Sequence, residues 1–458
     1  MVSTLMLLDL SDTEMAASLK RGGITIGLVG IGRIGLPTAA VFAESGAKVI
    51  GIDIDPEIVE KVNNGSVHID EPGLDRLVAS QVKKGNLRAT SNVEEAARES
   101  DVLIICVPTP IDSLKEPIYS QVEAACISVA KGLRKGSLVI IESTVGPGTV
   151  ENFIAPLLED ISGMRAGEDF GLASCPERAD PGSILENLRK VPRIVGGIDG
   201  RSTRTTAALY RAAMGVKVVE MSSPKSANAV KLTENISRDV NIALMNELAI
   251  LFERLGIDIL EVIEASSTKW NFMPHYPGAG VGGPCIPSNP YYLIREAQRV
   301  GYIPHLIRLA REVNDRMPAH VVELVMEALN EIGKTVNGSR IALLGVSYKP
   351  DISDIQLSPA EPIIRSLRRL GAELRGYDPC FPNQTVLDLR LDSSIDSAVG
   401  GADAVVLCTA HKEFKKLDFG KLSGLMSSPG AFIDARGAVD KSAVIKSGLI
   451  FKGVGRTS

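Results

Sequence analysis

A cysteine at the end of a glycine-rich stretch is the side chain best placed for covalent chemistry in this sequence. Residues 278–290 read GAGVGGPCIPSNP, and Cys285 ends the approach. The glycines that precede it are Gly278, Gly280, Gly282 and Gly283. An isolated cysteine is usually a small buried hydrophobic residue. The glycines argue against a core position, because they pack poorly there. They let the backbone approach a ligand and leave N–H groups for a phosphate. We therefore interpret Cys285 as a nucleophile.

Two polar residues share one face of an expected helix. Lys231 and Asn235, in KLTEN, are four residues apart, so that their side chains lie one helical turn apart. A lysine in a partly apolar helix can act as a base or can stabilise a developing alkoxide. A solvated or capping pair explains the spacing equally well, and both interpretations stay open.

Polar residues also follow three apolar runs, in the motifs VPTP, ESTV and PER. The carboxyl ends of strands in an open α/β sheet face the ligand crevice. The candidates at these ends are Thr109, Glu142, Thr144 and Glu177. The alternatives are a simple turn for VPTP, a helix cap for Thr144 and a surface ion pair for Glu177.

A glycine turn joins the first apolar run to a helical pattern. The motif GIGRIG supplies Gly30, Gly32, Arg33, Ile34 and Gly35. Its GxGxxG spacing suits a tight turn, close approach of a pyrophosphate and close packing of strand and helix. Asp53 follows 18 residues after Gly35. A carboxylate there binds a ribose diol and disfavours a 2′-phosphate, so NAD is the expected cofactor.

These residues require a sheet whose strands run in parallel between helices. Runs such as ITIGLVG, DVLIICVPTP and SLVIIEST alternate with helical patterns, which indicates an α/β fold with a doubly wound sheet. We expect a Rossmann-like domain over residues 1–221, with residues 1–22 as an N-terminal extension. A helical central domain over residues 222–335 carries the Cys285 loop and joins it to a second, smaller Rossmann-like domain over residues 336–458.

Composition limits the range of partners. The 458 residues carry a formal net charge of −5 without a long basic run, so we expect neither nucleic acid nor an anionic membrane as a partner. The six cysteines are scattered, and no apolar run reaches the roughly 20 residues of a bilayer span. These two features favour a cytoplasmic protein. We expect no metal site, because His275 and His411 have no partner at ligand spacing.

The motifs GIGRIGLP, VPTP, ESTVGPGT, PER, KLTEN, NELA, GVGGPC and SYKPDISD occur in this order. In this respect the chain resembles the UDP-glucose/GDP-mannose dehydrogenase family, from about residue 24 to residue 437. CIP after the glycines and NDRMP at residues 314–318 look more like the branch that acts on UDP-N-acetylmannosamine than the UDP-glucose branch.

The resemblance implies oxidation of the C6 hydroxyl of a UDP-sugar to a carboxylate, with two NAD⁺ and no metal, for polysaccharide synthesis. Lys231, or a water ordered by Thr144 and Asn235, would accept or stabilise the charge of the hydroxyl. Cys285 would trap the aldehyde as a thiohemiacetal, and a thioester would follow. Water activated near Glu177 would then release the acid.

The resemblance also places the glycine loop over the nucleotide-sugar, with Lys349 of SYKPD helping to close the site. The long helix that begins near residue 223 would make a homodimer or a larger homo-oligomer.

Four positions depart from the family pattern. Asn289 stands in place of an aspartate four residues after the cysteine, and an amide cannot take a proton. Asn228 replaces a glutamate, and Gln356 replaces an arginine that faces the dinucleotide phosphates. Asn271 replaces an arginine that contacts substrate, for which Lys269 can substitute.

Three alternatives follow. The substrate could be UDP-glucose or UDP-N-acetylglucosamine instead. The four departures could instead mark a catalytically weakened protein that binds NAD or a nucleotide-sugar. A two-electron hydroxyacid dehydrogenase of related architecture is also considered, but it has no use for Cys285.

Overall fold

The computed structural model describes residues 7–180 and 182–456. Residues 1–6 of the expected extension and residues 457–458 of the expected third domain lie outside this description. The chain divides into two compact units, of which the first comprises Met1–Glu234 and Tyr291–Tyr302. The second comprises Asn235–Pro290 and Ile303–Ser458.

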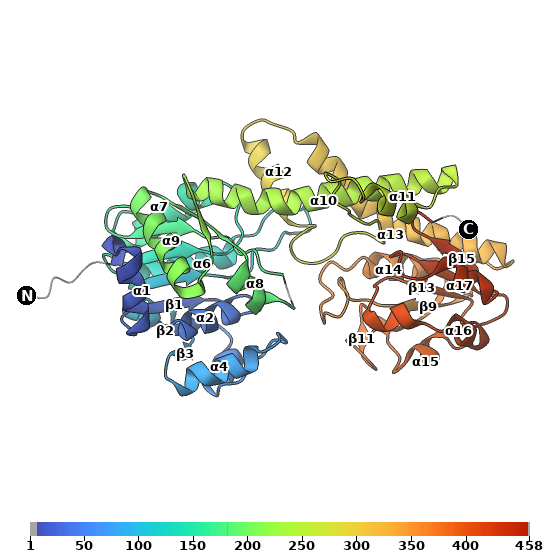
Figure 1. The fold of residues 1–458 in the computed structure, drawn as a ribbon, viewed down its shortest axis with the longest axis horizontal. Coiled ribbons are helices and arrows are strands. Elements are labelled where there is room, and N and C mark those ends of the chain that lie inside the picture. Colours follow the sequence, from blue (N-terminus) through green and yellow to red (C-terminus); the bar gives the residue numbers. More distant parts are fainter. Residues whose placement is uncertain (1–6, 181, 457–458) are drawn as a thin grey trace, which may run out of the picture. The chain divides into compact units, whose positions relative to one another are not determined.

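The first unit is built on an eight-stranded sheet (Figure 1). Its strands are β1 (Thr25–Val29), β2 (Lys48–Ile52), β3 (Leu87–Thr90), β4 (Val102–Ile105), β5 (Leu138–Ile141), β6 (Gly171–Ser174), β7 (Arg193–Gly197) and β8 (Val218–Met221). The order is β3-β2-β1-β4-β5-β6-β7-β8, and only the β6–β7 pair is antiparallel. Because β1 lies between β2 and β4, the order in which successive strands join the sheet reverses at β1. Doubly wound sheets bind ligands at such a reversal point.

Helices connect these strands. They are η1 (Leu7–Asp9), α1 (Asp12–Lys20), α2 (Gly35–Glu44), α3 (Pro56–Asn63), α4 (Leu74–Lys83), α5 (Val93–Glu99), α6 (Ser120–Gly132), the π-helix η2 (Val150–Ile154), α7 (Ala155–Ser162), α8 (Ile184–Lys190) and α9 (Gly200–Met214). The described part of the N-terminal extension is helical, and α1 packs against α9. Ion pairs of Asp9 with Arg201 and of Asp12 with Arg211, both at 2.9 Å, accompany this contact.

Four helices follow the first sheet. They are α10 (Pro224–Leu255), α11 (Ile259–Ser266), α12 (Asn289–Arg299) and α13 (His305–Glu331). Residues 224–234 of α10 belong to the first unit and the rest to the second, whereas α12 has most of its length in the first unit. Helix α13 continues through Pro318.

The second unit contains a smaller parallel sheet of order β10-β9-β13-β14-β15. Its elements are β9 (Arg340–Leu344), α14 (Ala360–Arg369), β10 (Glu373–Tyr377), the hairpin strands β11 (Thr385–Val386) and β12 (Leu389–Arg390), α15 (Ile395–Val399), β13 (Ala404–Leu407), η3 (Lys412–Lys416), α16 (Phe419–Leu425), β14 (Ala431–Asp434), α17 (Lys441–Lys446) and β15 (Ile450–Gly453). Here β9 lies between β10 and β13, which makes a second reversal point. The expected α/β class, with two Rossmann-like sheets and a helical segment between them, is confirmed.

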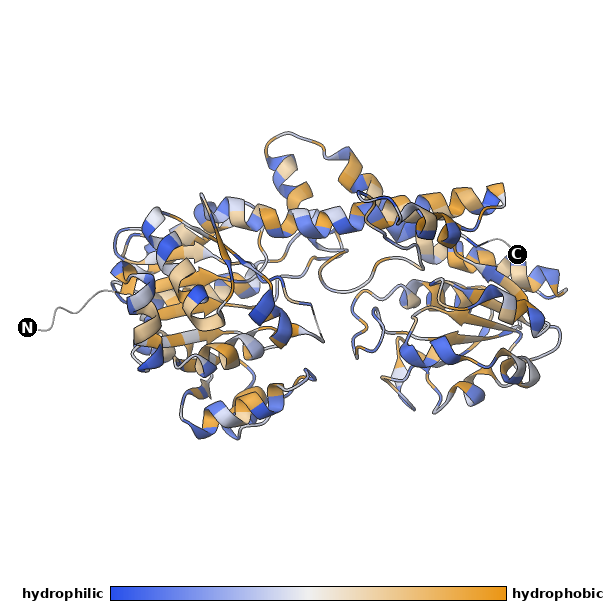
Figure 2. Cartoon of the chain, in the orientation of Figure 1, coloured by the Kyte–Doolittle hydropathy of each residue, from blue (hydrophilic) through white to orange (hydrophobic). Residues whose placement is uncertain are grey.

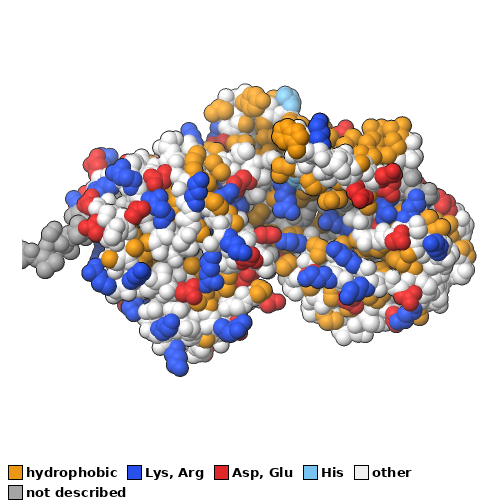
Figure 3. Space-filling view, viewed as in Figure 1, with side chains coloured by type: hydrophobic (Ala, Val, Ile, Leu, Met, Phe, Trp, Pro, Cys, Tyr) orange, Lys and Arg blue, Asp and Glu red, His pale blue; other side chains and the backbone are white. Residues whose placement is uncertain are grey.

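Continuous apolar runs explain why these segments are strands. Every residue of β4, β5 and β13 is buried, as in parallel sheets covered on both faces. Figure 2 shows the strands of both sheets mainly in the hydrophobic colour, while many helices carry both colours. On the face in Figure 3, basic and acidic side chains are interspersed over each unit, in keeping with totals of 50 and 55.

Candidate functional site

The glycine turn after β1 has a backbone that side chains would block. Gly30 has a φ of +91°, and its N–H donates to the Ile52 carbonyl at 2.8 Å. A Cβ on Gly35 would lie 1.9 Å from the carbonyl oxygen of Gly30, whereas a Cβ on Gly32 would meet no atom within 4 Å. Gly35 is thus required by packing between turn and helix, and Gly32 borders open space. This cradle fits a dinucleotide pyrophosphate at the N-terminus of α2.

Asp53, Arg33, Ile34 and Thr109 lie in turns that follow β1, β2 and β4 of the first sheet. Asp53 directly follows β2 and is half-buried, and its Oδ1 accepts the N–H of Asp55 at 3.1 Å. Arg33 is exposed on the turn and Ile34 is half-buried. The hydroxyl of Thr109 donates to the Thr144 carbonyl at 2.8 Å. The turns after β4 and β5 are therefore joined beside the glycine turn.

Glu142 and Glu177 lie in a buried cluster that the sequence did not indicate. The Arg193 guanidinium donates to both oxygens of Glu177, at 2.9 and 2.8 Å, and to Glu142 at 3.0 Å. The Tyr210 hydroxyl donates to the same Glu142 oxygen at 2.5 Å. The Glu142 side chain is fully buried, and its expected contact with the cofactor stays a prediction. Glu177 forms a buried ion pair rather than the surface pair considered as its alternative.

The two carboxyl groups in this cluster differ in proton affinity. Burial raises the pKa of Glu142 to about 7, although Arg193 opposes this shift. The pKa of Glu177 is lowered despite burial, because Arg193 and the N–H groups of Arg178 and Ala179 stabilise its charge. One arginine thus serves two carboxyl groups, and the one with more donors keeps the negative charge.

Arg193 and Tyr210 are the partners that sequence reasoning missed. Arg193 begins the apolar strand β7, and its side chain is about 1% exposed. A single arginine at the start of a buried apolar run was the available signal, because a buried guanidinium requires a carboxylate. Nothing in the sequence indicates which carboxylate pairs with Arg193.

Lys231 lies on α10 in the first unit and is 9% exposed. Asn228, one turn earlier, is buried, and its Oδ1 accepts the Ser174 hydroxyl at 2.8 Å. The amide at position 228 therefore has a structural partner at the end of β6. A carboxylate could also accept this bond, but it would carry a charge into a buried position.

The Cys285 loop lies in the second unit. Cys285 is exposed, and its carbonyl accepts the N–H groups of Ser288 at 3.2 Å and Asn289 at 2.9 Å. Asn289 is the first residue of α12, and its Oδ1 accepts from Asn235 Nδ2 at 2.5 Å. The structure thus brings Cys285, Asn289 and Asn235 together. Lys231, Thr144 and Glu177 belong to the first unit.

The glycines of this loop pass against the SYKPDISDIQ segment. The Gly283 N–H donates to the Gln356 carbonyl at 2.9 Å. A Cβ on Gly283 would lie 2.7 Å from the Tyr348 ring, and one on Gly282 would lie 2.8 Å from the Leu357 carbonyl oxygen. Gln356 is itself exposed, and Lys349 is half-buried in the same segment. Lys269 and Asn271 are exposed.

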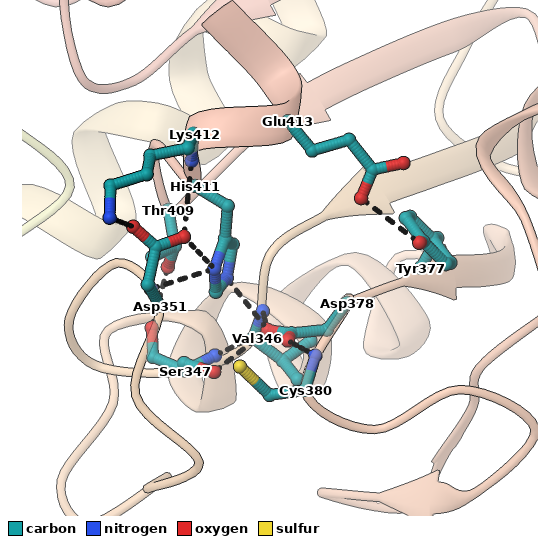
Figure 4. A network of polar contacts seen from close by, with 10 residues as sticks. All are labelled: Val346, Ser347, Asp351, Tyr377, Asp378, Cys380, Thr409, His411, Lys412 and Glu413. Carbon is teal, nitrogen blue, oxygen red and sulfur yellow. Dashed lines mark hydrogen bonds and ion pairs between the residues drawn. The ribbon is translucent and has the colours of Figure 1, made fainter. Parts of the chain in front are cut away.

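A second polar network lies at the carboxyl ends of β9, β10 and β13 (Figure 4). One oxygen of Asp378 accepts the N–H groups of Val346 and Ser347 at 2.8 and 2.9 Å, and the imidazole Nε2 of His411 lies 3.1 Å away. The other His411 nitrogen accepts the Asp351 N–H at 2.9 Å. These bonds hold the segment that carries Lys349, and they lower the pKa of Asp378.

This network brings together ligand atoms of Asp378, Cys380 and His411 within 4.8 Å of one another. The donor set does not fit a metal ion. Because Nδ1 of His411 accepts a backbone N–H, Nε2 must carry the imidazole proton and donate it to Asp378. A protonated nitrogen cannot coordinate a metal, so the arrangement is explained by loop support.

The first sheet and its glycine turn define a dinucleotide-binding protein. Three models of the UDP-glucose/GDP-mannose dehydrogenase family match the chain. The NAD binding domain matches residues 24–214, the central domain residues 225–316 and the UDP binding domain residues 342–441. The chain belongs to the UDP-glucose/GDP-mannose dehydrogenase family.

Curated relatives and solved structures agree with this assignment. The chain is 40% identical to the UDP-N-acetyl-D-mannosamine dehydrogenase of Pyrococcus horikoshii, over 94% of this chain and 99% of the relative. It is 34% identical to the UDP-N-acetyl-D-glucosamine 6-dehydrogenase of Pseudomonas aeruginosa, over 91% and 98% of the two chains. A solved structure of the Pyrococcus horikoshii dehydrogenase superposes with a TM-score of 0.88 at 39% identity, covering 94% of this chain and 99% of that one.

The protein is therefore an NAD-dependent UDP-sugar dehydrogenase. The predicted family, enzyme class and cofactor are confirmed. Over residues 7–180 and 182–456, the helices are too short or too polar to cross a membrane.

Proposed function

We propose that the protein oxidises UDP-N-acetyl-D-mannosamine at C6 to UDP-N-acetyl-D-mannosaminuronate, a four-electron oxidation. The observation that supports this substrate best is the 40% identity to the UDP-N-acetyl-D-mannosamine dehydrogenase of Pyrococcus horikoshii over 94% of the chain. The product is a precursor for surface polysaccharide.

Cys285 is the proposed nucleophile. It attacks the C6 aldehyde to form a thiohemiacetal, which a second oxidation converts to a thioester. NAD⁺, when bound, accepts one hydride in each of the two oxidations. The exposure of Cys285 and its position in the loop that leads into α12, with Asn289 and Asn235 close by, support this role.

The other roles concern protons and water. Lys231, or a water ordered by Thr144 and Asn235, takes or stabilises the charge of the C6 hydroxyl. Glu177 is proposed to orient the water that hydrolyses the thioester. The low pKa of its carboxyl group makes it a weak base, which favours orientation over proton removal.

Binding roles complete the proposal. The cofactor contacts are assigned to Gly30, Gly32, Arg33, Ile34, Gly35, Asp53, Thr109, Thr144 and Gln356. The substrate contacts are assigned to Gly278, Gly280, Gly282, Gly283, Lys269, Lys349, Glu177, Lys231 and Asn235. Glu142, whose side chain is fully buried next to Arg193, is also assigned to the cofactor contacts.

A panel of UDP-sugars tests the substrate. We expect kcat/KM for UDP-N-acetylmannosamine to exceed the values for UDP-N-acetylglucosamine and UDP-glucose by at least about tenfold, a difference of about 1.4 kcal/mol. NADH formation measured at 340 nm gives all three values. A higher value for either competitor would overturn the assignment.

Two alternatives have specific support. The 34% identity to a UDP-N-acetyl-D-glucosamine 6-dehydrogenase favours the second sugar of the panel. Asn289, an amide where the family has a carboxylate, favours a protein that binds NAD or a UDP-sugar without full turnover. Calorimetric binding of a UDP-sugar and NAD⁺ without NADH formation would identify the latter.

We also propose a cytoplasmic homodimer. Leu244, Leu251 and Leu255 are 49%, 47% and 60% exposed, and their spacing along α10 places them on a common face. An exposed apolar stripe on a long helix suits contact with a second copy. We retain the three-part division into residues 1–221, 222–335 and 336–458 as a proposal.

A further inference from the structure

A buried ion pair lies between α10 and α13 in the second unit. The Arg311 guanidinium donates to Asp239 Oδ1 at 2.6 Å, and the two side chains are 2% and 0% exposed. Desolvation makes such a pair a weak source of stability, so a role in fixing the orientation of its neighbours is the better explanation.

The Asp239 carboxylate determines the orientation of the Asn314 amide. Asn314 Nδ2 lies 2.8 Å from Asp239 Oδ1 and 3.0 Å from the Asp239 carbonyl oxygen. Both atoms only accept hydrogen bonds, so the amide nitrogen must face them. Asn314 Oδ1 consequently faces Asn246 and accepts from its Nδ2 at 2.8 Å.

The orientation of Asn314 in turn determines that of Asn246. With its nitrogen committed to Asn314, Asn246 presents Oδ1 to the N–H of Gly278, which donates at 2.9 Å. Asn246 and Asn314 are each about 1% exposed or less, so water does not offer alternative partners. Reversing either amide would set donor against donor or acceptor against acceptor.

The hydrogen bonds that run from Arg311 through Asp239, Asn314 and Asn246 to Gly278 form what we call the relay. Gly278 begins the loop that ends at Cys285, and this loop stays close to the relay. A Cβ on Gly280 would lie 3.2 Å from the Asn314 carbonyl oxygen, and Gly280 has a φ of +124°. The far end of the loop is held by the Gly283 N–H bond to Gln356. The buried relay thus determines where the loop starts and how closely it passes α13.

We infer that Asn246 and Asn314 are positioning residues for Cys285. The Arg311–Asp239 pair fixes the orientation of the Asn314 amide, and Asn314 fixes that of Asn246, which binds the first residue of the glycine loop. Each amide has only one orientation in which donors face acceptors. The inference rests on the proposed function, in which Cys285 is the nucleophile, and it deepens that function by naming what holds the loop.

Exchanging the polar groups tests the relay. Asn314→Asp sets a carboxylate oxygen, in place of the amide nitrogen, against the two Asp239 acceptors, Oδ1 and the carbonyl oxygen. Asp239→Asn removes the carboxylate that accepts from both Arg311 and Asn314. We expect each variant to lower kcat/KM at least about tenfold.

Alkylation by iodoacetamide gives a readout that does not depend on the sugar substrate. The rate at Cys285, followed by mass spectrometry of its peptide, should change severalfold in each variant. NAD⁺ affinity should stay unchanged in all of them, because the glycine turn lies in the first unit. If no UDP-sugar is oxidised by the wild type, the proposed function fails, but the alkylation rates still test the relay.

Further variants guard against misfolding and general effects. Asn246→Asp keeps the acceptor for Gly278 but faces Asn314 with an acceptor, and it should repeat the change in alkylation rate if Asn314→Asp does not fold. Asn241→Asp on the same helix, where the side chain bonds its own helix at Ser237, should behave as wild type. Folded variants with wild-type alkylation rates at Cys285 would overturn the inference.

Discussion

In the proposed mechanism, Asn289 should influence how quickly the covalent intermediate is released. Its amide lies one helical turn from Cys285 and is bonded to Asn235. An amide can orient water or a carbonyl group but cannot accept a proton from water. Thioester hydrolysis should therefore be slower here than with a carboxylate at this position.

Asn289→Asp should speed release of the acid. Rapid-quench experiments on the wild type should show a burst of NADH followed by a slower steady state, with a covalent adduct at Cys285. The variant should lose the burst and gain at least about threefold in kcat, because hydrolysis would no longer limit turnover. Asn330→Asp, the same change at an exposed position of α13, serves as the control. Absence of an adduct in the wild type, with acid released as fast as the first NADH, would contradict this account.

Glu142 should make folding stability depend on pH near neutrality. Its pKa of about 7 in the folded protein lies above the ordinary value of 4.5, so the folded protein binds a proton that the unfolded chain has released. The free energy of unfolding therefore falls as the pH rises from about 4.5 to about 7. Glu177 stays ionised through this window because its pKa is lowered.

Glu142→Gln should remove that dependence. Between pH 5 and pH 7.5 the wild type should lose about 2 kcal/mol more stability than the variant. Urea unfolding at several pH values measures the difference. Parallel curves for the two proteins would show that Glu142 is ionised throughout.

Among the elements, the glycine turn, the helix α2 that follows it and the buried strands could be predicted from local sequence. Continuous apolar runs predict strands that are buried on both faces, as in β4 and β5. These strands and the turn between β1 and α2 were therefore predictable. The partners of Glu142 and Glu177 were not. Arg193 is 16 residues from Glu177 in the chain. Local sequence patterns do not indicate which residues pair over such a separation. The same holds for Asn246 and Asn314, which are 68 residues apart.

Two glycine variants separate packing from ligand approach in this element. Gly35→Ala would place a Cβ against the Gly30 carbonyl and should lower stability by about 1–3 kcal/mol as well as weaken NAD⁺ binding. Gly32→Ala meets no protein atom and should leave stability within about 0.5 kcal/mol while still weakening NAD⁺ binding. Thermal unfolding and calorimetric titration with NAD⁺ measure both effects. Unchanged NAD⁺ affinity in Gly32→Ala would show that the pyrophosphate does not approach there.

At the scale of the whole molecule, two sheets with reversal points serve two nucleotides. The first unit carries the match to the NAD binding domain, and the UDP binding domain matches the second sheet. The central domain match, over residues 225–316, includes both Lys231 and Cys285. The proposed chemistry of Lys231 and Cys285 thus falls on the segment that lies, in sequence, between the two nucleotide-binding sheets.

The stoichiometry of the reaction distinguishes a four-electron oxidation through Cys285 from a two-electron one. With limiting UDP-N-acetylmannosamine and excess NAD⁺, we expect two NADH for each sugar consumed and a uronate as the product. Cys285→Ala should abolish this yield, while Cys126→Ala, a buried thiol on α6, should preserve it. One NADH for each sugar, or an undiminished yield from Cys285→Ala, would contradict a four-electron oxidation through Cys285.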